Sequence, residues 1–216
     1  MQTEWISIAE NNRHLIVYFA GWGTSPDLVK NWQIPPGHDV LLVWDYRTLD
    51  LNFDFSRYSQ RNLVAWSMGV WAAEQSVADL AFATAVAING TPHLSDDELG
   101  IPTAIFQGTL AGFNPLTRSK FERRMCGNRD FLQQYQAVSL RSTEEIAAEL
   151  NAVNAHLPLS KPPVIAWRKA IIGEQDQIFP SANQQRYWQQ TDCQIEQLTA
   201  PHFLFPLLNG WDRLCR

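Results

Sequence analysis

The stretch Leu63–Ala73 constrains the fold more than any other part of this 216-residue sequence. Its first four residues form an apolar run that predicts a buried strand, and an alanine-rich, helix-forming segment begins directly after Ser67. A strand, a serine and a helix with no loop between them have the layout of a nucleophile elbow, here spaced Ala65-x-Ser67-x-Gly69. Small residues suit the outer positions because so sharp a turn brings them against other backbone. The turn would set the serine oxygen beside the first free N–H groups of the helix, which favour a developing oxyanion.

The rest of the sequence supplies partners for this serine. A serine hydroxyl is a weak nucleophile at neutral pH, so it needs a base to take its proton and an acid to orient that base. Of the five histidines, only His202 follows the last predicted strand, where a loop can reach back over the elbow. Asp176 stands just past a buried strand in a Gly-x-x-Asp turn. The order Ser67, Asp176, His202 is the order of the catalytic residues in α/β-hydrolases.

Each of these features has an ordinary structural explanation when it is taken alone. Short strings like the elbow arise by chance, an aspartate after a strand is commonly a turn former, and a histidine before a helix is commonly a cap. The loop Gly21-Trp22-Gly23, which could bring backbone N–H groups close to a ligand, could equally be a tight turn before a helix at 27–32. The four features occur together in the expected order, and this conjunction predicts a serine hydrolase.

The remaining apolar runs predict the architecture around the elbow. Besides the elbow strand, the sequence predicts strands at 3–8, 14–20, 39–45, 84–89, 166–172 and about 192–198. A polar and aromatic stretch at 46–61 is predicted to be a loop, and a closing helix is expected over about 203–214. Strands that alternate with helices in this way indicate a mainly parallel α/β sheet with helices on both faces.

The segment at approximately 114–160 departs from this alternation, because it is helical and contains no strong strand. Ser142–Glu145 has the spacing of a capping box, and Ile146, Leu150 and Val153 follow at helical intervals. Helices inserted between the strands of such a sheet predict a cap over its carboxyl edge, where small molecules bind. We therefore expect a single domain over 1–216 that carries a helical cap insertion.

Composition limits the classes of function that remain. With 45% hydrophobic and 18% charged residues, the chain has the make-up of one soluble globular domain. A net charge of −5 argues against general nucleic-acid binding, and no apolar run approaches the roughly 20 residues of a membrane span. The N-terminus has no recognisable signal peptide. Three cysteines without metal-ligand spacing predict reduced thiols, no metal site and a cytoplasmic location.

Several stretches give the chain a more specific resemblance. They are Phe19–Gly23, Ala65–Gly69, Ile105–Thr109, Phe121–Gly127 and Asp176–Pro180, and they span nearly the whole chain. In these stretches the sequence resembles the BioG type of pimeloyl-[acyl-carrier-protein] methyl ester esterase, a compact family of α/β-hydrolases. Ala65 replaces the glycine that commonly begins the elbow, and its small side chain should be tolerated there.

The resemblance implies a fold, a reaction and a role for each site residue. The implied fold is that of an α/β-hydrolase, with a mainly parallel central sheet flanked by helices and a small helical cap. The implied reaction releases methanol from pimeloyl-ACP methyl ester, in biotin biosynthesis, without a metal or any other cofactor. Ser67 would be the nucleophile, His202 the general base and then acid, and Asp176 the orienting acid. The backbone N–H groups of Trp22 and Met68 would form the oxyanion hole.

A basic segment fits the acyl carrier protein that this resemblance implies as a partner. Residues 117–129 carry a net charge of +4, so the remainder of the chain carries −9. On a helix, Lys120, Arg123 and Arg124 share one face, and Phe121 lies on another. The basic face would dock the acidic carrier, while Trp22 and Phe121 would contact its phosphopantetheine-linked acyl chain. The alternative is a solvated helix face with an ion pair between residues 118 and 122.

Two other functions are compatible with these residues. A carboxylesterase or thioesterase for another acyl substrate would use the same serine, histidine and aspartate. A noncatalytic binding protein could also be built on this fold, although an intact set of catalytic residues argues against it.

Overall fold

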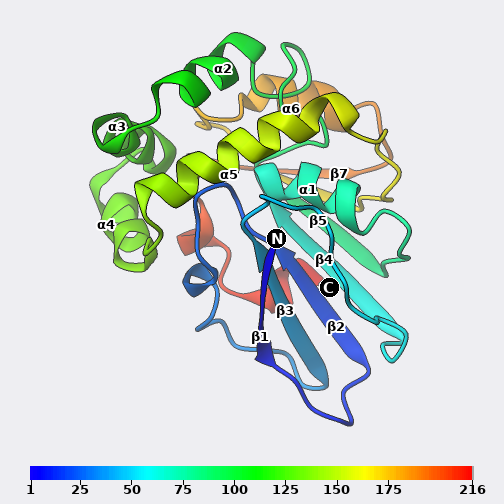
Figure 1. Ribbon diagram of the computed structural model, residues 1–216. Helices are drawn as coiled ribbons and strands as arrows, with labels where there is room; N and C mark the ends of the chain where they lie inside the picture. Colours follow the sequence, from blue (N-terminus) through cyan, green and yellow to red (C-terminus); the bar gives the residue numbers. More distant parts are fainter. Residues whose placement is uncertain (216) are drawn as a thin grey trace.

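A seven-stranded sheet forms the centre of the computed structural model, which describes residues 1–215 (Figure 1). The strand order is β1-β3-β2-β4-β5-β6-β7. Only β1 runs antiparallel to its neighbour, and each of the other pairs is parallel. The strands are β1 (Gln2–Ser7), β2 (His14–Phe19), β3 (His38–Trp44), β4 (Gln60–Trp66), β5 (Thr84–Ile88), β6 (Lys169–Gly173) and β7 (Gln194–Leu198).

The central strands are apolar on both sides because each side of the sheet has its own core. In β2, Leu15, Val17 and Phe19 belong to one core, and Ile16 and Tyr18 belong to the other. The first core contains residues of α1 (Met68–Ser76) and α6 (Ser181–Trp188), and the second contains residues of α7 (Trp211–Cys215). Alternate residues of a strand point to opposite faces, so two covered faces require continuous apolar runs. The predicted parallel α/β sheet is confirmed.

The first two strands are consecutive in the chain but are not neighbours in the sheet, because β1 pairs with β3. Two local predictions were wrong. The helix expected at 27–32 is only the short 3₁₀ turn Pro26–Leu28. The closing helix expected at about 203–214 is divided into the 3₁₀ turn Phe205–Leu207 and α7. Asn209 and Gly210 separate these two pieces with φ angles of 57° and 106°, which a continuous helix cannot contain.

A run of helices lies between β5 and β6 in the chain. They are α2 (Thr103–Gly112), α3 (Pro115–Cys126), α4 (Arg129–Val138) and α5 (Thr143–His156), followed by the 3₁₀ turn Leu157–Leu159. The first of these helices begins before the expected boundary near 114. Ser142 caps α5 in the predicted capping box. In Figure 1 these helices lie beyond the carboxyl end of β4, and α5 crosses above the sheet. We refer to residues 103–159 as the cap segment.

The α-helices of the described chain are between five and 14 residues long. None within residues 1–215 combines the length and the apolar character needed to cross a membrane. The longest is α5, with 14 residues and four acidic or basic side chains among them when His156 is counted.

Candidate active site

Ser67 occupies a strained turn between β4 and α1. Its backbone angles are φ 56° and ψ −123°, which non-glycine residues rarely adopt. The turn is held by a hydrogen bond from the Ser67 N–H to the Ile88 carbonyl, 2.8 Å long. A Cβ at Gly69 would lie 2.4 Å from the backbone carbonyl oxygen of Phe19, and a Cβ at Gly90 would lie 2.5 Å from the backbone carbonyl oxygen of Ser67. Close backbone approach therefore requires glycine at both places, and the requirement at Gly90 was not predicted from the sequence.

The structure brings Ser67, His202 and Asp176 together at the carboxyl edge of the sheet. His202 Nε2 lies 3.0 Å from Ser67 Oγ, and His202 Nδ1 lies 2.7 Å from Asp176 Oδ2. All three residues are buried, with exposed fractions of 6%, 2% and 7% for Ser67, His202 and Asp176. An ionised carboxylate can only accept hydrogen bonds, so the proton belongs on Nδ1 and Nε2 is left to accept from the serine hydroxyl. This is the arrangement that a general base needs.

Asp176 is oriented by its own turn and by α6. Its Oδ1 accepts hydrogen bonds from the N–H groups of Ile178 and Phe179, at 2.8 and 2.9 Å. Its Oδ2 accepts one from Gln184 Nε2 at 3.0 Å, in addition to the contact with His202. Both oxygens are thus held by donors from neighbouring elements. A carboxylate fixed in this way can hold the histidine ring in one orientation and one tautomer.

Asn89 is a second support for the histidine, and it was not predicted from the sequence. It follows β5 with φ 44°, a left-handed conformation that asparagine tolerates better than most residues. Its Nδ2 donates to the carbonyls of Pro201 and His202, at 3.2 and 2.8 Å, and its Oδ1 accepts from the Gly173 N–H at 2.6 Å. Asn89 therefore ties the end of β6 to the loop that carries the histidine. An asparagine at the end of a buried strand was the signal that could have revealed it.

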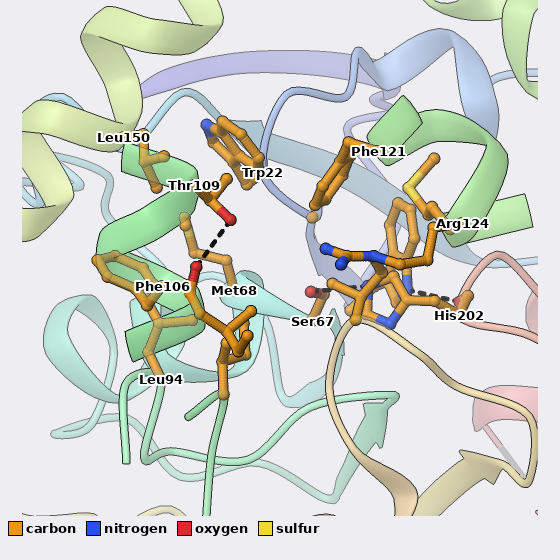
Figure 2. Close-up of a pocket in the computed structure, with 16 residues that line it drawn as sticks. Trp22, Ser67, Met68, Leu94, Phe106, Thr109, Phe121, Arg124, Leu150 and His202 are labelled. Atoms are coloured by element: carbon orange, nitrogen blue, oxygen red, sulfur yellow. Dashed lines mark hydrogen bonds between the residues drawn. The ribbon is translucent and has the colours of Figure 1, made fainter. Parts of the chain in front are cut away.

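The cavity above Ser67 is almost entirely apolar. In Figure 2, Leu94, Phe106 and Leu150 lie on one side of Ser67, and Phe121, Arg124 and His202 lie on the other. Trp22 and Phe121, both predicted to contact substrate, line the cavity with their ring centroids 5.2 Å apart. The other lining residues are Gly21, Trp66, Met68, Ile101, Ile105, Thr109, Met125 and Ile178. Such walls suit a hydrocarbon chain that carries a single ester group.

The two predicted oxyanion donors lie at this cavity. Met68 is the first residue of α1, and Trp22 lies in the loop that follows β2. Both residues line the cavity together with Ser67. Within residues 1–215, neither backbone N–H donates a hydrogen bond to another group of the chain. They are therefore free to bind an oxygen of a substrate.

The basic residues of α3 fall into different environments. Lys120, Arg123 and Arg124 are exposed. Arg124 also lines the catalytic cavity and holds its guanidinium 5.9 Å from the centre of the Phe121 ring. By contrast, Arg118 is bound to Glu122 at 2.8 Å and to the Arg141 carbonyl at 2.9 Å, so its charge serves the packing of the cap segment. The predicted basic face is present, and one of its residues also belongs to the cavity wall.

A family model described as "Pimeloyl-ACP methyl esterase BioG" matches residues 1–214. The chain belongs to the BioG family. A crystal structure of BioG from Haemophilus influenzae covers all of this chain and all of its own, with 40% identity and a TM-score of 0.94. As a BioG protein, the chain is a carboxylic ester hydrolase, and its reaction is hydrolysis of the methyl ester of pimeloyl-ACP. The resemblance seen in the sequence is confirmed, and the noncatalytic alternative is set aside.

Two curated relatives and one distant structure complete the comparison. An uncharacterized protein of Haemophilus influenzae is 43% identical over 202 residues, which are 93% of this BioG chain and 94% of that protein. A malonyl-[acyl-carrier protein] O-methyltransferase of Bacteroides fragilis is 40% identical over 195 residues, which are 88% of this chain but 40% of that longer protein. The enol-lactonase from Burkholderia xenovorans has 16% identity and a TM-score of 0.65, over 94% of this chain and 89% of its own. The predicted α/β-hydrolase fold is confirmed.

Proposed function

We propose that Ser67, His202 and Asp176 carry out the ester hydrolysis of this BioG chain as a catalytic triad. Ser67 Oγ attacks the carbonyl carbon of the methyl ester while His202 Nε2 takes the hydroxyl proton. The same nitrogen then returns the proton to the departing methoxide, and methanol leaves an acyl-enzyme. Water, deprotonated by His202, attacks that acyl-enzyme and releases a carboxylic acid and free Ser67. The contacts at 3.0 and 2.7 Å that join the three residues beneath an apolar cavity carry this proposal.

The oxyanion formed in both steps is assigned to the backbone N–H groups of Trp22 and Met68. Support comes from their position beside Ser67 and from their lack of acceptors within residues 1–215. Met68 also begins α1, so the positive end of that helix dipole faces the developing charge. Donors fixed in place before the reaction stabilise the oxyanion without a cost of reorganisation.

A groove between α2 and α3 offers a route for the carrier-bound end of the substrate. It shares Ile105, Thr109, Phe121 and Arg124 with the catalytic cavity, so the two spaces adjoin. Lys120 also lines the groove. We place the phosphopantetheine arm in this groove and the acyl carrier protein on the basic face of α3. The positive charges there complement an acidic carrier, and such complementarity chiefly accelerates encounter. The free thiols of the described chain agree with a reaction in the cytoplasm.

The proposal is tested by identifying both the nucleophile and the bond that is cleaved. A fluorophosphonate probe should modify the peptide that contains Ser67, and an adduct on any other peptide would refute the assignment. Incubation with pimeloyl-ACP methyl ester, followed by mass spectrometry of the carrier, should show loss of the methyl group with retention of the pimeloyl chain. Loss of the entire acyl chain would instead reveal a thioesterase that uses the same triad.

A further inference from the structure

Glu149, on cap helix α5, is fully buried against the loop that follows β2. Its Oε2 accepts a hydrogen bond from the Gly23 N–H at 3.3 Å, and its Oε1 accepts one from the Tyr46 N–H at 3.0 Å. One carboxylate therefore accepts hydrogen bonds from the backbone of the two loops that follow the neighbouring strands β2 and β3. The hydrogen bonds of this side chain go to none of the three triad residues, and the proposed mechanism does not use Glu149.

Helix α5 holds the same loop at a second point. The indole N–H of Trp22 donates to the Ile146 carbonyl at 2.9 Å. Gly23 has φ 73°, and a Cβ there would lie 3.1 Å from Ile146 Cγ2, so the helix packs directly on the loop. The Trp22 side chain and the Gly23 amide are thus both bound to α5. The backbone N–H of Trp22 belongs to the peptide group directly before these two attachments, so its direction depends on how they hold the loop.

The surroundings of Glu149 neutralise its charge. Arg141 donates to Glu149 at 2.6 Å and lies 3.3 Å from Asp45, which is also paired with Arg47. Two carboxylates and two guanidinium groups leave the cluster without net charge, so it adds little repulsion to an oxyanion nearby. Burial raises the pKa of Glu149, and this effect exceeds the opposing influence of Arg141.

We propose that Glu149 is a positioning residue for the oxyanion hole. By holding the Gly23 amide, it sets the direction of the Trp22 N–H, and it thereby makes helix α5 a fixed part of the catalytic apparatus. The inference rests on the proposed function, since it requires the Trp22 N–H to be a donor to the reacting oxygen. Removing a whole donor typically costs about 10²- to 10³-fold in kcat, so misdirecting one should cost about 10- to 10²-fold.

Glu74 provides a matched control. It is also fully buried and also accepts three N–H bonds, from Val164 at 2.9 Å, Ile165 at 3.2 Å and the Trp167 indole at 2.8 Å. Burial raises its pKa as well. Its hydrogen bonds go to the segment before β6 and not to the loop after β2. Replacing Glu74 should therefore reproduce the structural cost of losing a buried carboxylate without disturbing the oxyanion hole.

The experiment compares Glu149→Gln with Glu74→Gln in the full chain. In Glu149→Gln a single oxygen must serve the Gly23 and Tyr46 amides, because the side-chain NH₂ can only donate. Both variants should melt at a lower temperature than the wild type. On p-nitrophenyl acetate, kcat should fall about 10- to 10²-fold in Glu149→Gln with little change in KM, and it should be nearly unchanged in Glu74→Gln. Binding of a trifluoromethyl ketone, which forms an oxyanion on serine, should weaken by the same factor as kcat.

Three outcomes would overturn the inference. The first is a Glu149→Gln variant with lower melting temperature but wild-type kcat, which would make Glu149 purely structural. The second is an equal loss of kcat in Glu74→Gln. If Glu149→Gln does not fold, Glu149→Asp replaces it, since aspartate keeps the charge but has a side chain too short to reach both amides. The third outcome is a folded Glu149→Asp variant with wild-type kcat. Ser67→Ala distinguishes failure of the Glu149 inference from failure of the proposed function, because activity in Ser67→Ala would refute the catalytic triad itself.

Discussion

The elbow region and the basic face of α3 serve one reaction in the proposed function, but they are held in place very differently. Ser67, His202 and Asp176 are buried, and fixed donors surround the aspartate. Lys120 and Arg123 are exposed and form no ion pair with any other residue in the described range 1–215. Chemistry at the elbow requires groups held within tenths of an ångström, whereas encounter with a charged partner requires only the sign and location of the charge. Substitutions in the two regions should therefore affect different kinetic quantities.

The largest effect is expected at the proposed nucleophile. Ser67→Ala should lower kcat by about 10⁴-fold or more on every ester while leaving the fold intact, because the proposed mechanism forms the acyl-enzyme on Ser67 Oγ. The measurement is turnover of pimeloyl-ACP methyl ester and of p-nitrophenyl acetate, with the melting temperature as a check on folding. Retention of more than a few per cent of wild-type turnover would require a different nucleophile.

Asp176→Asn should come next, with kcat reduced by about 10⁴-fold on both substrates. The amide would offer an N–H toward His202 Nδ1 and favour the tautomer that cannot accept the Ser67 proton. Asp54→Asn is the matched control, since that carboxylate is exposed and is hydrogen-bonded to Ser56 instead of to a histidine. If the control lost activity and Asp176→Asn did not, the assignment of the orienting acid would be wrong.

On the basic face, the comparison predicts a loss that depends on the substrate. The double reversal Lys120→Glu and Arg123→Glu should lower kcat/KM for pimeloyl-ACP methyl ester by about 10- to 10³-fold, the range of electrostatic steering. Turnover of p-nitrophenyl acetate should hardly change. Arg124 is left intact because it lines the catalytic cavity, and its replacement would mix docking with chemistry.

A second double reversal controls for net charge. Lys161→Glu with Arg168→Glu changes the charge of the chain by the same amount, and Arg168 precedes β6 at the edge of the sheet opposite Ser67. This control should keep most of the activity on the carrier substrate. Equal losses in the two double variants would mean that overall charge, and not the face of α3, governs the encounter. Equal losses on both substrates would mean that α3 shapes the cavity.

The smallest effect is expected from salt. Raising the ionic strength from about 0.01 M to about 1 M shortens the Debye length from about 30 Å to about 3 Å, which screens exposed charges but hardly affects buried contacts. For the wild type, kcat/KM on the carrier substrate should fall over this range, while kcat on p-nitrophenyl acetate stays level. The Lys120 and Arg123 double variant should be nearly insensitive. A similar salt response in both proteins would place the docking site elsewhere.

Local patterns in the sequence were sufficient for most of the sheet and for the site residues. Strands β2, β3 and β5 lie within one residue of the predicted runs, because burial on both faces demands continuous apolar segments. The serine, aspartate and histidine could be selected because each follows a strand end, and the carboxyl ends of parallel strands meet at one edge. Their catalytic roles stay predictions, although the structure brings their side chains within hydrogen-bond distance.

The sequence was therefore enough to infer the parallel sheet, the elbow, the order of the three site residues and the basic stretch, because each of these depends on neighbours along the chain. Only the folded chain reveals the pairing of β1 with β3, the tie that Asn89 makes to the histidine loop, and the contact of Glu149 with Gly23. It also divided the basic residues into Arg118 within the cap segment and Arg124 at the cavity. These features join residues that are distant in the sequence, and no local propensity or spacing encodes which distant groups will meet.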